Sequence, residues 1–456
     1  MTIEVNVETF HETSLQPNLL DRDAFLTGLL NQFSASEKSG WVQQSKNDAV
    51  KWVRHSVIPN TRDEEWRFTD LSPLKKVTFN SVGTIHELSL TDDFVLPEVA
   101  HRLVFVNGVF AANLSNTENL PAGLKVGNLD VLGDDVAEKY LAQSEGTRDV
   151  FTALNTAGLN DVAVVLVGKN VIVENPIHLL FISVAAEGAI ISQPRCLVVA
   201  ESNSQLSLIE EFITGNGEYL TGKMPVPQEQ QVYFNNSVTE IWVNENAQVN
   251  HNRIVLESNA AFHIGKTAVT QARYSRYTCN AVTVGGKISR HNLDILQTGE
   301  QTETTLNGLT VIADKQLADT HSAISLNHPH GVSKQLHKCI IGDRAHGVFN
   351  GKIFVPKPAQ LTDAAQLNRN LLLSSKARID TKPQLEITAD NVKCAHGATV
   401  SQLEDDEIFY LQSRGIDETD ARKLLVNAFA AEIINLIPVS SLREKLIKTV
   451  ITITNK

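Results

Sequence analysis

Three things are scarce in this sequence of 456 residues: cysteine, long apolar runs and positive charge. The four cysteines, Cys196, Cys279, Cys339 and Cys394, lie 55 to 83 residues apart with no CxxC pair, so neither a disulfide framework nor a zinc knuckle is encoded locally. No apolar stretch approaches the roughly 20 residues of a membrane span, and the first residues show no signal-peptide pattern. We therefore expect a soluble cytoplasmic protein, or a protein of the plastid stroma if a transit peptide was removed.

The deficit of positive charge indicates which classes of partner the protein does not bind. The 40 Lys and Arg residues stand against 52 Asp and Glu residues, which gives a formal net charge of -12. Nucleic acids and anionic membranes are bound through dense patches of Lys and Arg. We therefore expect no nucleic-acid partner and no membrane partner.

Motifs for nucleotide binding and hydrolysis are missing as well. Gly285-Gly286-Lys287 and Gly351-Lys352 lack the upstream Gly and the following Ser or Thr of a phosphate-binding loop. Neither G-x-S-x-G nor H-E-x-x-H occurs. The paired acids of Asp405-Asp406-Glu407 lie at a predicted helix start, where the helix dipole explains them better than glycoside hydrolysis does. We expect no catalytic residue, and any ATP consumed must be bound by another chain.

Helical periodicity marks the N-terminal part of the chain. Residues 1–100 are predicted to form a mainly helical region, because apolar residues recur at helical spacing from about residue 18 to 56. The segment Asp63–Asp70 follows with two large aromatics, Trp66 and Phe68. We interpret both as packing anchors, with a ligand contact as the alternative.

Residues 101–400 change to short β-branched runs separated by Gly, Asn, Asp and Ser, as in Val162–Val167, Leu206–Ile209 and Val249–Val255. Helical periods almost vanish there, which excludes a doubly wound α/β sheet and leaves a sandwich, a barrel or a parallel β-solenoid. Three hundred residues are long for a sandwich, whereas a solenoid grows by adding coils that cover one another's edges. The predicted fold is therefore mainly β, a β-helix core over residues 101–400.

The helical period returns over residues 401–456. Asp405–Ser413 carries acids in its first turn and ends at Gly415, and a second helix is predicted over Asp417–Asn435. Ser441-Leu-Arg-Glu444 predicts a third helix that begins with a capping box. The apolar surface of the middle helix is too broad for one stripe, so we expect it to be buried on more than one side, by its own body or by a partner.

The pair Cys394-x-His396 is the strongest candidate for chemistry. In an extended segment both side chains point to the same face, where a thiolate and an imidazole suit a soft metal or an iron-sulfur centre. Two ligands do not close a site, so the others must come from far away or from another subunit. A buried thiol beside a hydrogen-bonded imidazole is the structural alternative.

Five histidines and one cysteine gather between residues 321 and 346. A metal site and a set of histidines bonded to turns of the solenoid are the two interpretations, and the second is favoured. The His328-Pro-His330 pair lacks the glutamate of a cupin, since Lys334 and Gln335 stand in its place. The residues of this cluster are His321, His328, His330, His337, Cys339 and His346.

The sequence of residues 290–415, considered as a whole, closely resembles the SufB and SufD family of iron-sulfur assembly proteins. The resemblance extends to the N-terminal Glu65-Trp-Arg-Phe-Thr-Asp-Leu71 and favours the SufD branch. Its motifs are Leu306-Asn-Gly-Leu309, Asp319-Thr-His321, Ser333-Lys-Gln-Leu-His-Lys338, Val348-Phe-Asn-Gly-Lys-Ile353, Ala359-Gln-Leu-Thr-Asp-Ala-Ala-Gln366, Asn370-Leu-Leu-Leu-Ser374, Pro383-Gln-Leu-Glu-Ile387, Cys394-Ala-His-Gly-Ala-Thr399 and Phe409-Tyr-Leu-Gln-Ser-Arg-Gly415.

This resemblance implies a right-handed parallel β-helix between helical regions, paired along the β-helix with a SufB partner. It implies that iron or an iron-sulfur cluster is held transiently at that interface by a SufB cysteine and His396, with Cys394 either a ligand or a structural residue. The isolated chain would hold no permanent cofactor, and a homodimer of the isolated chain is possible. The SufC ATPase would dock on residues of about 402 to 450, with Phe409, Tyr410, Arg414 and Phe429 as candidate contacts.

Two other functions are alternatives to a scaffold for iron-sulfur cluster assembly. A β-helix carbohydrate enzyme would need convergent acids and an arginine on one face of the solenoid. A histidine-rich metal-storage protein is motivated by the cluster between residues 321 and 346. The scaffold hypothesis differs from both, because it predicts little bound metal without the partner.

Overall fold

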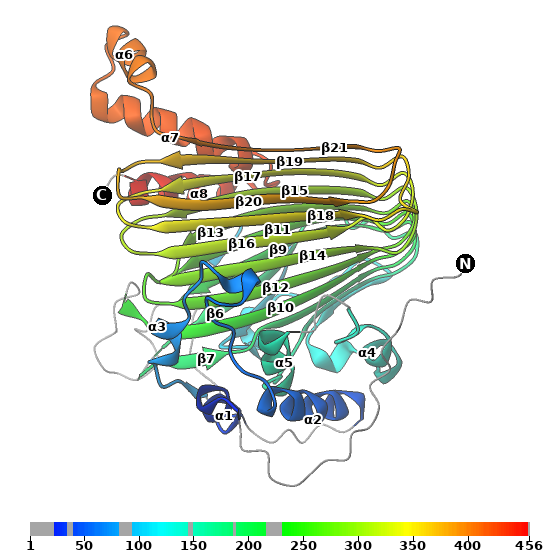
Figure 1. The fold of residues 1–456 in the computed structure, drawn as a ribbon. Coiled ribbons are helices and arrows are strands. Elements are labelled where there is room, and N and C mark those ends of the chain that lie inside the picture. The colour runs from blue at the N-terminus through cyan, green and yellow to red at the C-terminus, as the bar shows by residue number, and fades with distance from the viewer. Residues whose placement is uncertain are drawn as a thin grey trace.

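The computed structural model describes residues 22–33, 40–81, 94–144, 149–185, 188–215 and 230–454. Two β-sheets lie face to face, and successive coils of the chain contribute one strand to each (Figure 1). In the regular part every strand pairs in parallel with the strands of the coils before and after it. The predicted parallel β-solenoid between helical regions is confirmed.

The strands follow in two sets and the helices in a third. The first sheet has eleven strands in the described residues: β1 (Asn80–Ser81), β4 (Leu124–Gly127), β5 (Ala163–Val167), β7 (Ile190–Ser192), β8 (Arg195–Ala200), β10 (Tyr233–Val243), β12 (Phe262–Gln271), β14 (Ile288–Gln297), β16 (Leu317–Ser325), β18 (His346–Val355) and β20 (Arg378–Ile387). The second has ten: β2 (His101–Val106), β3 (Val109–Phe110), β6 (Ile177–Ser183), β9 (Gln205–Thr214), β11 (Gln248–Glu257), β13 (Arg276–Gly285), β15 (Glu303–Ile312), β17 (Val332–Ile341), β19 (Asp363–Leu372) and β21 (Lys393–Ser401). The α-helices are α1 (Ala24–Leu30), α2 (Trp41–Arg54), α3 (Ser72–Lys75), α4 (Asp134–Tyr140), α5 (Val150–Ala157), α6 (Asp405–Ser413), α7 (Glu418–Ile434) and α8 (Ser440–Thr454), and short 3-10 turns lie at Glu64–Trp66, Ala112–Leu114 and Leu129–Val131. In the part of the chain described here, no helix is both long and apolar enough to cross a bilayer.

The turns between coils explain the spacing of polar residues in the sequence. Glu303 pairs with Val332 and Val332 with Asp363, so neighbouring coils are offset by 29 and 31 residues. Asn246 and Asp314 sit in these turns with φ values of 55° and 55°. Asn and Asp tolerate this left-handed conformation better than other side chains.

A continuous apolar core fills the space between the two sheets. It is built from inward-facing residues of both, including Leu208, Phe212, Ile241, Ile295 and Leu306, all at most 5% exposed. Because side chains alternate along a strand, the residues between these point outward and must be covered separately.

Two groups of helices cover the two outer faces. Helices α1, α2 and α5 pack on the first sheet at Phe234, Phe262 and Ile288. Helices α7 and α8 pack on the second sheet over Ile254 and Leu309. The middle C-terminal helix is thus buried on more than one side, as predicted, because α7 packs on both the sheet and α8. Helices α4 and α5 lie within the stretch for which the sequence pattern indicated almost no helix.

The predicted capping box of the last helix is wrong. Helix α8 begins at Ser440, one residue early, and the carboxylate of Glu98 caps it from another part of the chain. Glu98 accepts hydrogen bonds from the backbone N–H of Ser441 at 2.8 Å and from the hydroxyls of Ser440 and Ser441 at 2.5 and 2.6 Å. A carboxylate from Glu98 therefore replaces the expected local one from Glu444.

The two ends of the solenoid differ. At the first end the sheets finish in short antiparallel strands, β4 beside β5 and β3 beside β2. At the other end β20 and β21 are the last strands of their sheets, and neither pairs with a further described strand. We call this end, formed by β20 and β21, the open end.

Candidate functional site

Cys394 and His396 both lie on β21, the last strand at the open end. Their register partners on β19 are Ala364 and Gln366, which are 1% and 2% exposed and face the interior. By alternation along the strand, Cys394 and His396 face the same way. The predicted common face of the pair is therefore present, and it is the interior face of the terminal coil.

The two side chains differ in exposure. Cys394 is half-buried and packs against the apolar core, and this burial raises the pKa of its thiol. A raised pKa disfavours the thiolate that would ligate a metal. His396 is exposed, because no further described coil lies beyond it. The imidazole of His396 is therefore more accessible from solvent than the thiol of Cys394.

The open end does not hold a metal site by itself. The described residues contain no group of three or more His, Cys, Asp and Glu side chains arranged to hold a metal ion. A tetrahedral site needs four donors. Cys394 and His396 are two potential donors on β21, fewer than such a site needs.

The histidines between residues 321 and 346 are a cluster in sequence only. His337 lies in the interior beside Phe349, where burial lowers its pKa to about 4, whereas His346 contacts Asp380 on the outer face of the first sheet at 2.7 Å. Cys339 is fully buried and its pKa is raised by burial to about 12. His337, Cys339 and His346 are close in the sequence but lie on different sheets and different faces. The cluster therefore no longer supports a metal-storage protein.

His321 belongs to an ionic cluster under the segment 63–70. Its ring contacts Glu65 at 3.1 Å and Asp319 at 2.9 Å. Burial opposes the change, yet the carboxylates of Asp319 and Glu65 raise the pKa of His321. Arg290 and the hydroxyl of Thr69 also bind Asp319. The sequence did not reveal this cluster, because its members are about 250 residues apart.

Trp66 is a packing anchor within the same segment. Its ring centroid lies 5.3 Å from that of Phe151 and 3.8 Å from the guanidinium carbon of Arg290. Phe68 is half-buried and lines a small cavity with His321 and Asn350. The structural interpretation of Trp66 is therefore confirmed.

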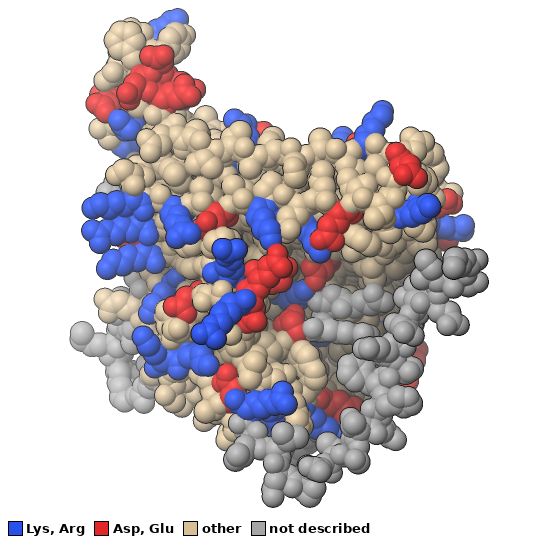
Figure 2. All heavy atoms as spheres, viewed as in Figure 1, with Lys and Arg blue, Asp and Glu red and all other residues tan. Residues whose placement is uncertain are grey.

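The four candidate partner contacts lie on two helices. Phe409 and Tyr410 are 71% and 58% exposed on α6, and Arg414 donates to the Tyr410 hydroxyl at 3.2 Å. Figure 1 shows α6 projecting from the solenoid, and Figure 2 shows acidic side chains gathered there, in agreement with the acids of its first turn. Phe429 lies apart from these three on α7, half-buried with the Lys338 ammonium 3.9 Å from its ring.

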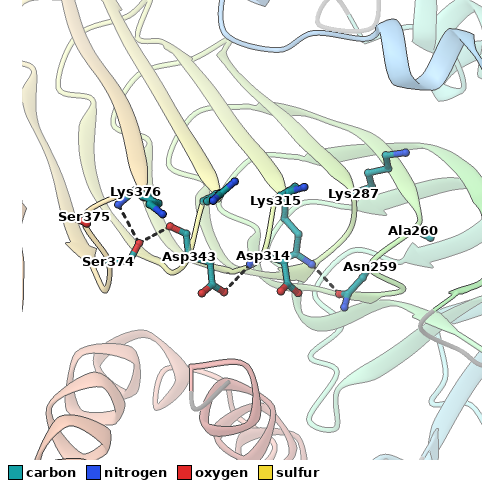
Figure 3. A pocket seen from close by; sticks show the side chains of 11 residues that line it. Asn259, Ala260, Lys287, Asp314, Lys315, Asp343, Ser374, Ser375 and Lys376 are labelled. Atoms are coloured by element: carbon teal, nitrogen blue, oxygen red, sulfur yellow. Dashed lines mark hydrogen bonds between the residues drawn. The ribbon is translucent and has the colours of Figure 1, made fainter.

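A cavity of about 860 Å³ lies along the turns that lead into β14, β16, β18 and β20. Figure 3 shows Lys287, Lys315 and Lys376 projecting away from Asp314 and Asp343, whose carboxylates point in another direction. Ammonium groups are hydrogen-bond donors and cannot ligate a metal. Neither Cys394 nor His396 lines this cavity, so it is separate from the candidate site at the open end.

Comparison with known proteins agrees with this geometry. Residues 181–429 match the family model described as "SUF system FeS cluster assembly, SufBD core domain", and residues 30–179 match "SufBD protein N-terminal region". The chain belongs to the SufBD family. Both models together span the solenoid and helices α2 and α5, which cover its first sheet.

Three SufBD relatives cover most of this chain. An iron-sulfur cluster assembly SufBD family protein of Synechocystis sp. is 47% identical over 96% of this chain and 95% of its own length. The protein ABCI7, chloroplastic, of Arabidopsis thaliana is 34% identical over 91% of this chain and 87% of its own length. The iron-sulfur cluster assembly protein SufD of Escherichia coli is 30% identical over 86% of this chain and 88% of its own length.

Proposed function

We propose that this SufBD family chain is a non-enzymatic, SufD-like scaffold subunit for iron-sulfur cluster assembly. In this proposal His396 contributes one ligand to an iron ion or nascent cluster that passes through the complex as cargo. The partner is a SufB-type chain that joins at the open end and brings the missing ligands. The cluster is held only within the complex, so the isolated chain retains no cofactor.

One observation carries this proposal: the exposed imidazole of His396 lies on β21, which pairs with no strand beyond it in the described part of the chain. A further strand can pair with the free N–H and C=O groups of such an edge and thereby bring its side chains beside His396. Cys394 remains a possible second ligand, although its burial against the core favours structural support.

The substitution His396→Ala tests the ligand role in the reconstituted complex. We expect cluster formation, followed by absorbance and by iron and sulfide content, to fall strongly while the complex still assembles. His55→Ala is the matched control, since His55 is exposed at the end of α2 and lies outside β21. Unchanged cluster formation in His396→Ala would overturn the ligand role.

A SufC-type ATPase is the proposed partner of α6 and α7. The support is the pair of exposed aromatics, Phe409 and Tyr410, on a helix that projects from the body, because exposed aromatic patches mark protein interfaces. The sequence of this chain has no phosphate-binding loop, which agrees with a partner chain that binds the ATP. Arg414 and Phe429 are the remaining proposed contacts.

Co-purification with the ATPase tests this dock. The double substitution Phe409→Ala and Tyr410→Ala should abolish capture of the ATPase, while the β-helix keeps its circular dichroism spectrum. Trp52→Ala provides a matched control, since Trp52 is a 45% exposed aromatic on α2. Retained capture in the double variant would place the dock elsewhere.

A further inference from the structure

Gln366 lies directly behind His396 in the stack of coils. The two are register partners on β19 and β21, and the side chain of Gln366 is turned into the interior, where the residue is 2% exposed. From this position a side chain can hydrogen-bond one nitrogen of the His396 ring, while the other nitrogen points out of the open end.

Hydrogen bonds fix the orientation of the Gln366 amide. Its Nε2 donates to Gln335 Oε1 at 2.7 Å, and Gln335 Nε2 donates in turn to Ser322 Oγ at 2.7 Å. In this assignment the Gln366 nitrogen is turned toward Gln335 and its carbonyl oxygen Oε1 lies on the other side of the amide.

The assignment leaves one acceptor without a partner. Gln366 Oε1 is buried and receives no hydrogen bond within the described part of the chain. An unpaired carbonyl oxygen is costly to bury, so a hydrogen-bond donor is favoured there. His396, one coil further on the same face, carries an imidazole N–H that can serve.

Gly351, on the opposite sheet, leaves the space that the Gln366 amide occupies. A methyl group at Gly351 would lie 2.1 Å from Gln366 Nε2 and 2.7 Å from its Cδ. Real Cβ atoms do not approach so closely, which means that only glycine leaves room for this amide. The position of Gln366 is thus set by packing as well as by hydrogen bonds.

We propose that Gln366 is a positioning residue for His396, in which Gln366 Oε1 accepts one imidazole N–H and so directs the other ring nitrogen outward as the ligand. Metal-binding histidines generally use their second nitrogen in this way, and loss of the supporting acceptor weakens metal binding about 10- to 100-fold. The inference rests on the proposed ligand role of His396, but the tautomer it predicts is measurable without any metal.

Nitrogen NMR of the full chain with labelled histidine tests the hydrogen bond directly. The His396 signal is assigned as the one missing from His396→Ala, and a single dominant neutral tautomer is expected. Gln366→Met keeps the side-chain length and removes the acceptor, so the ring should revert to the mixture of a free imidazole. Gln366→Glu retains an acceptor oxygen and should restore the dominant tautomer.

Two further variants separate positioning from stability. Gly351→Ala leaves Gln366 unchanged in chemistry but displaces its amide, and it should also abolish the tautomer preference. Asn370→Ala removes another buried amide of β19, which bonds Asn368 and the carbonyl of Thr399, and should leave the His396 tautomer unchanged. Thermal unfolding shows whether the Gln366 and Asn370 variants are comparably destabilised.

Ferrous iron titrated into the complex with the partner provides the second measurement, with a 10- to 100-fold loss of affinity expected for Gln366→Met. A free-imidazole mixture in the unsubstituted chain, or an unchanged tautomer in Gln366→Met, would overturn the inference. Either result leaves the proposed function standing, provided that His396→Ala still blocks cluster formation. If His396→Ala has no effect on clusters while the tautomer responds to Gln366, the proposed function alone fails.

Discussion

The guanidinium carbon of Arg290 lies 3.8 Å from the centroid of the Trp66 ring, so a strand of the first sheet and the N-terminal segment 63–70 share one contact. The same guanidinium binds Asp319 on the neighbouring strand β16. Arg290 and Asp319 are both 2% exposed. The arginine therefore neutralises a buried carboxylate and holds the aromatic ring at the same time.

Replacing Arg290 by Met should destabilise the protein by about 3–5 kcal/mol, because the buried Asp319 carboxylate loses its permanently charged partner and keeps only His321. The denaturant midpoint of unfolding measures the effect. Arg276→Met is the matched control, since Arg276 pairs with Glu303 at the surface and both side chains are about half exposed. That control should cost less than about 1 kcal/mol. Equal losses in the two variants would contradict the role given to Arg290.

A buried histidine makes stability depend on pH on the alkaline side. His251 contacts Glu210 at 3.1 Å and the Tyr277 hydroxyl at 2.9 Å. Burial opposes its protonation, yet hydrogen bonds to Cys279 and Glu210 raise the pKa of His251 to about 9. The folded-state pKa lies above the unfolded value of about 6.5, so this contribution is complete below pH 6.5 and is lost as the pH rises to 9.

We expect the free energy of unfolding to fall across that window, by an amount on the order of 3 kcal/mol. His251→Gln should flatten the fall. His337→Gln should not, because the pKa of His337 is lowered to about 4 and its contribution changes only on the acid side of pH 6.5. An unaltered alkaline slope in His251→Gln would show that other groups titrate there.

Lys338 attaches α7 to the second sheet. Its ammonium, almost fully buried, donates to the carbonyl of Phe429 at 2.7 Å and to Glu432 at 2.6 Å. Lys338→Met should loosen α7 by about 1–3 kcal/mol, because the carbonyl loses its partner and the ring its cation. Hydrogen exchange should rise in α7 and stay unchanged in β9 and β11. Lys334→Met, at an exposed position of the same strand, should alter neither.

Glu98 caps the last helix from about 340 residues away. The hydroxyls of Ser440 and Ser441 lower the pKa of Glu98 to about 2. Glu98→Ala should cost about 1 kcal/mol, as the loss of other N-terminal caps does. Thermal unfolding of Glu98→Ala beside Glu444→Ala decides which acid caps the helix. A larger loss in Glu444→Ala would support the local capping box instead.

The sequence predicted what depends on short-range pattern and missed what depends on distant residues. Runs such as Val249–Val255 and the helix stop at Gly415, with φ of 87°, were recognisable because each is a local preference of the chain. Glu98 and the cluster of Glu65, Arg290 and Asp319 were not, because their partners lie hundreds of residues away. His396 was found from its motif, yet its companion Gln366 became visible only when register placed the two side by side.

The difference between the two ends of the solenoid determines how large an assembly can grow. The first end finishes in strands of two and four residues that run against their neighbours, and short edges of this kind resist further pairing. Among the strands that the structure describes, the long free ones lie at the β20–β21 end. A subunit that pairs through a single end would be monovalent, because pairing would use up the surface that could recruit a third copy. Such a chain would form pairs and stop, and the stacking of coils would not continue into a fibre.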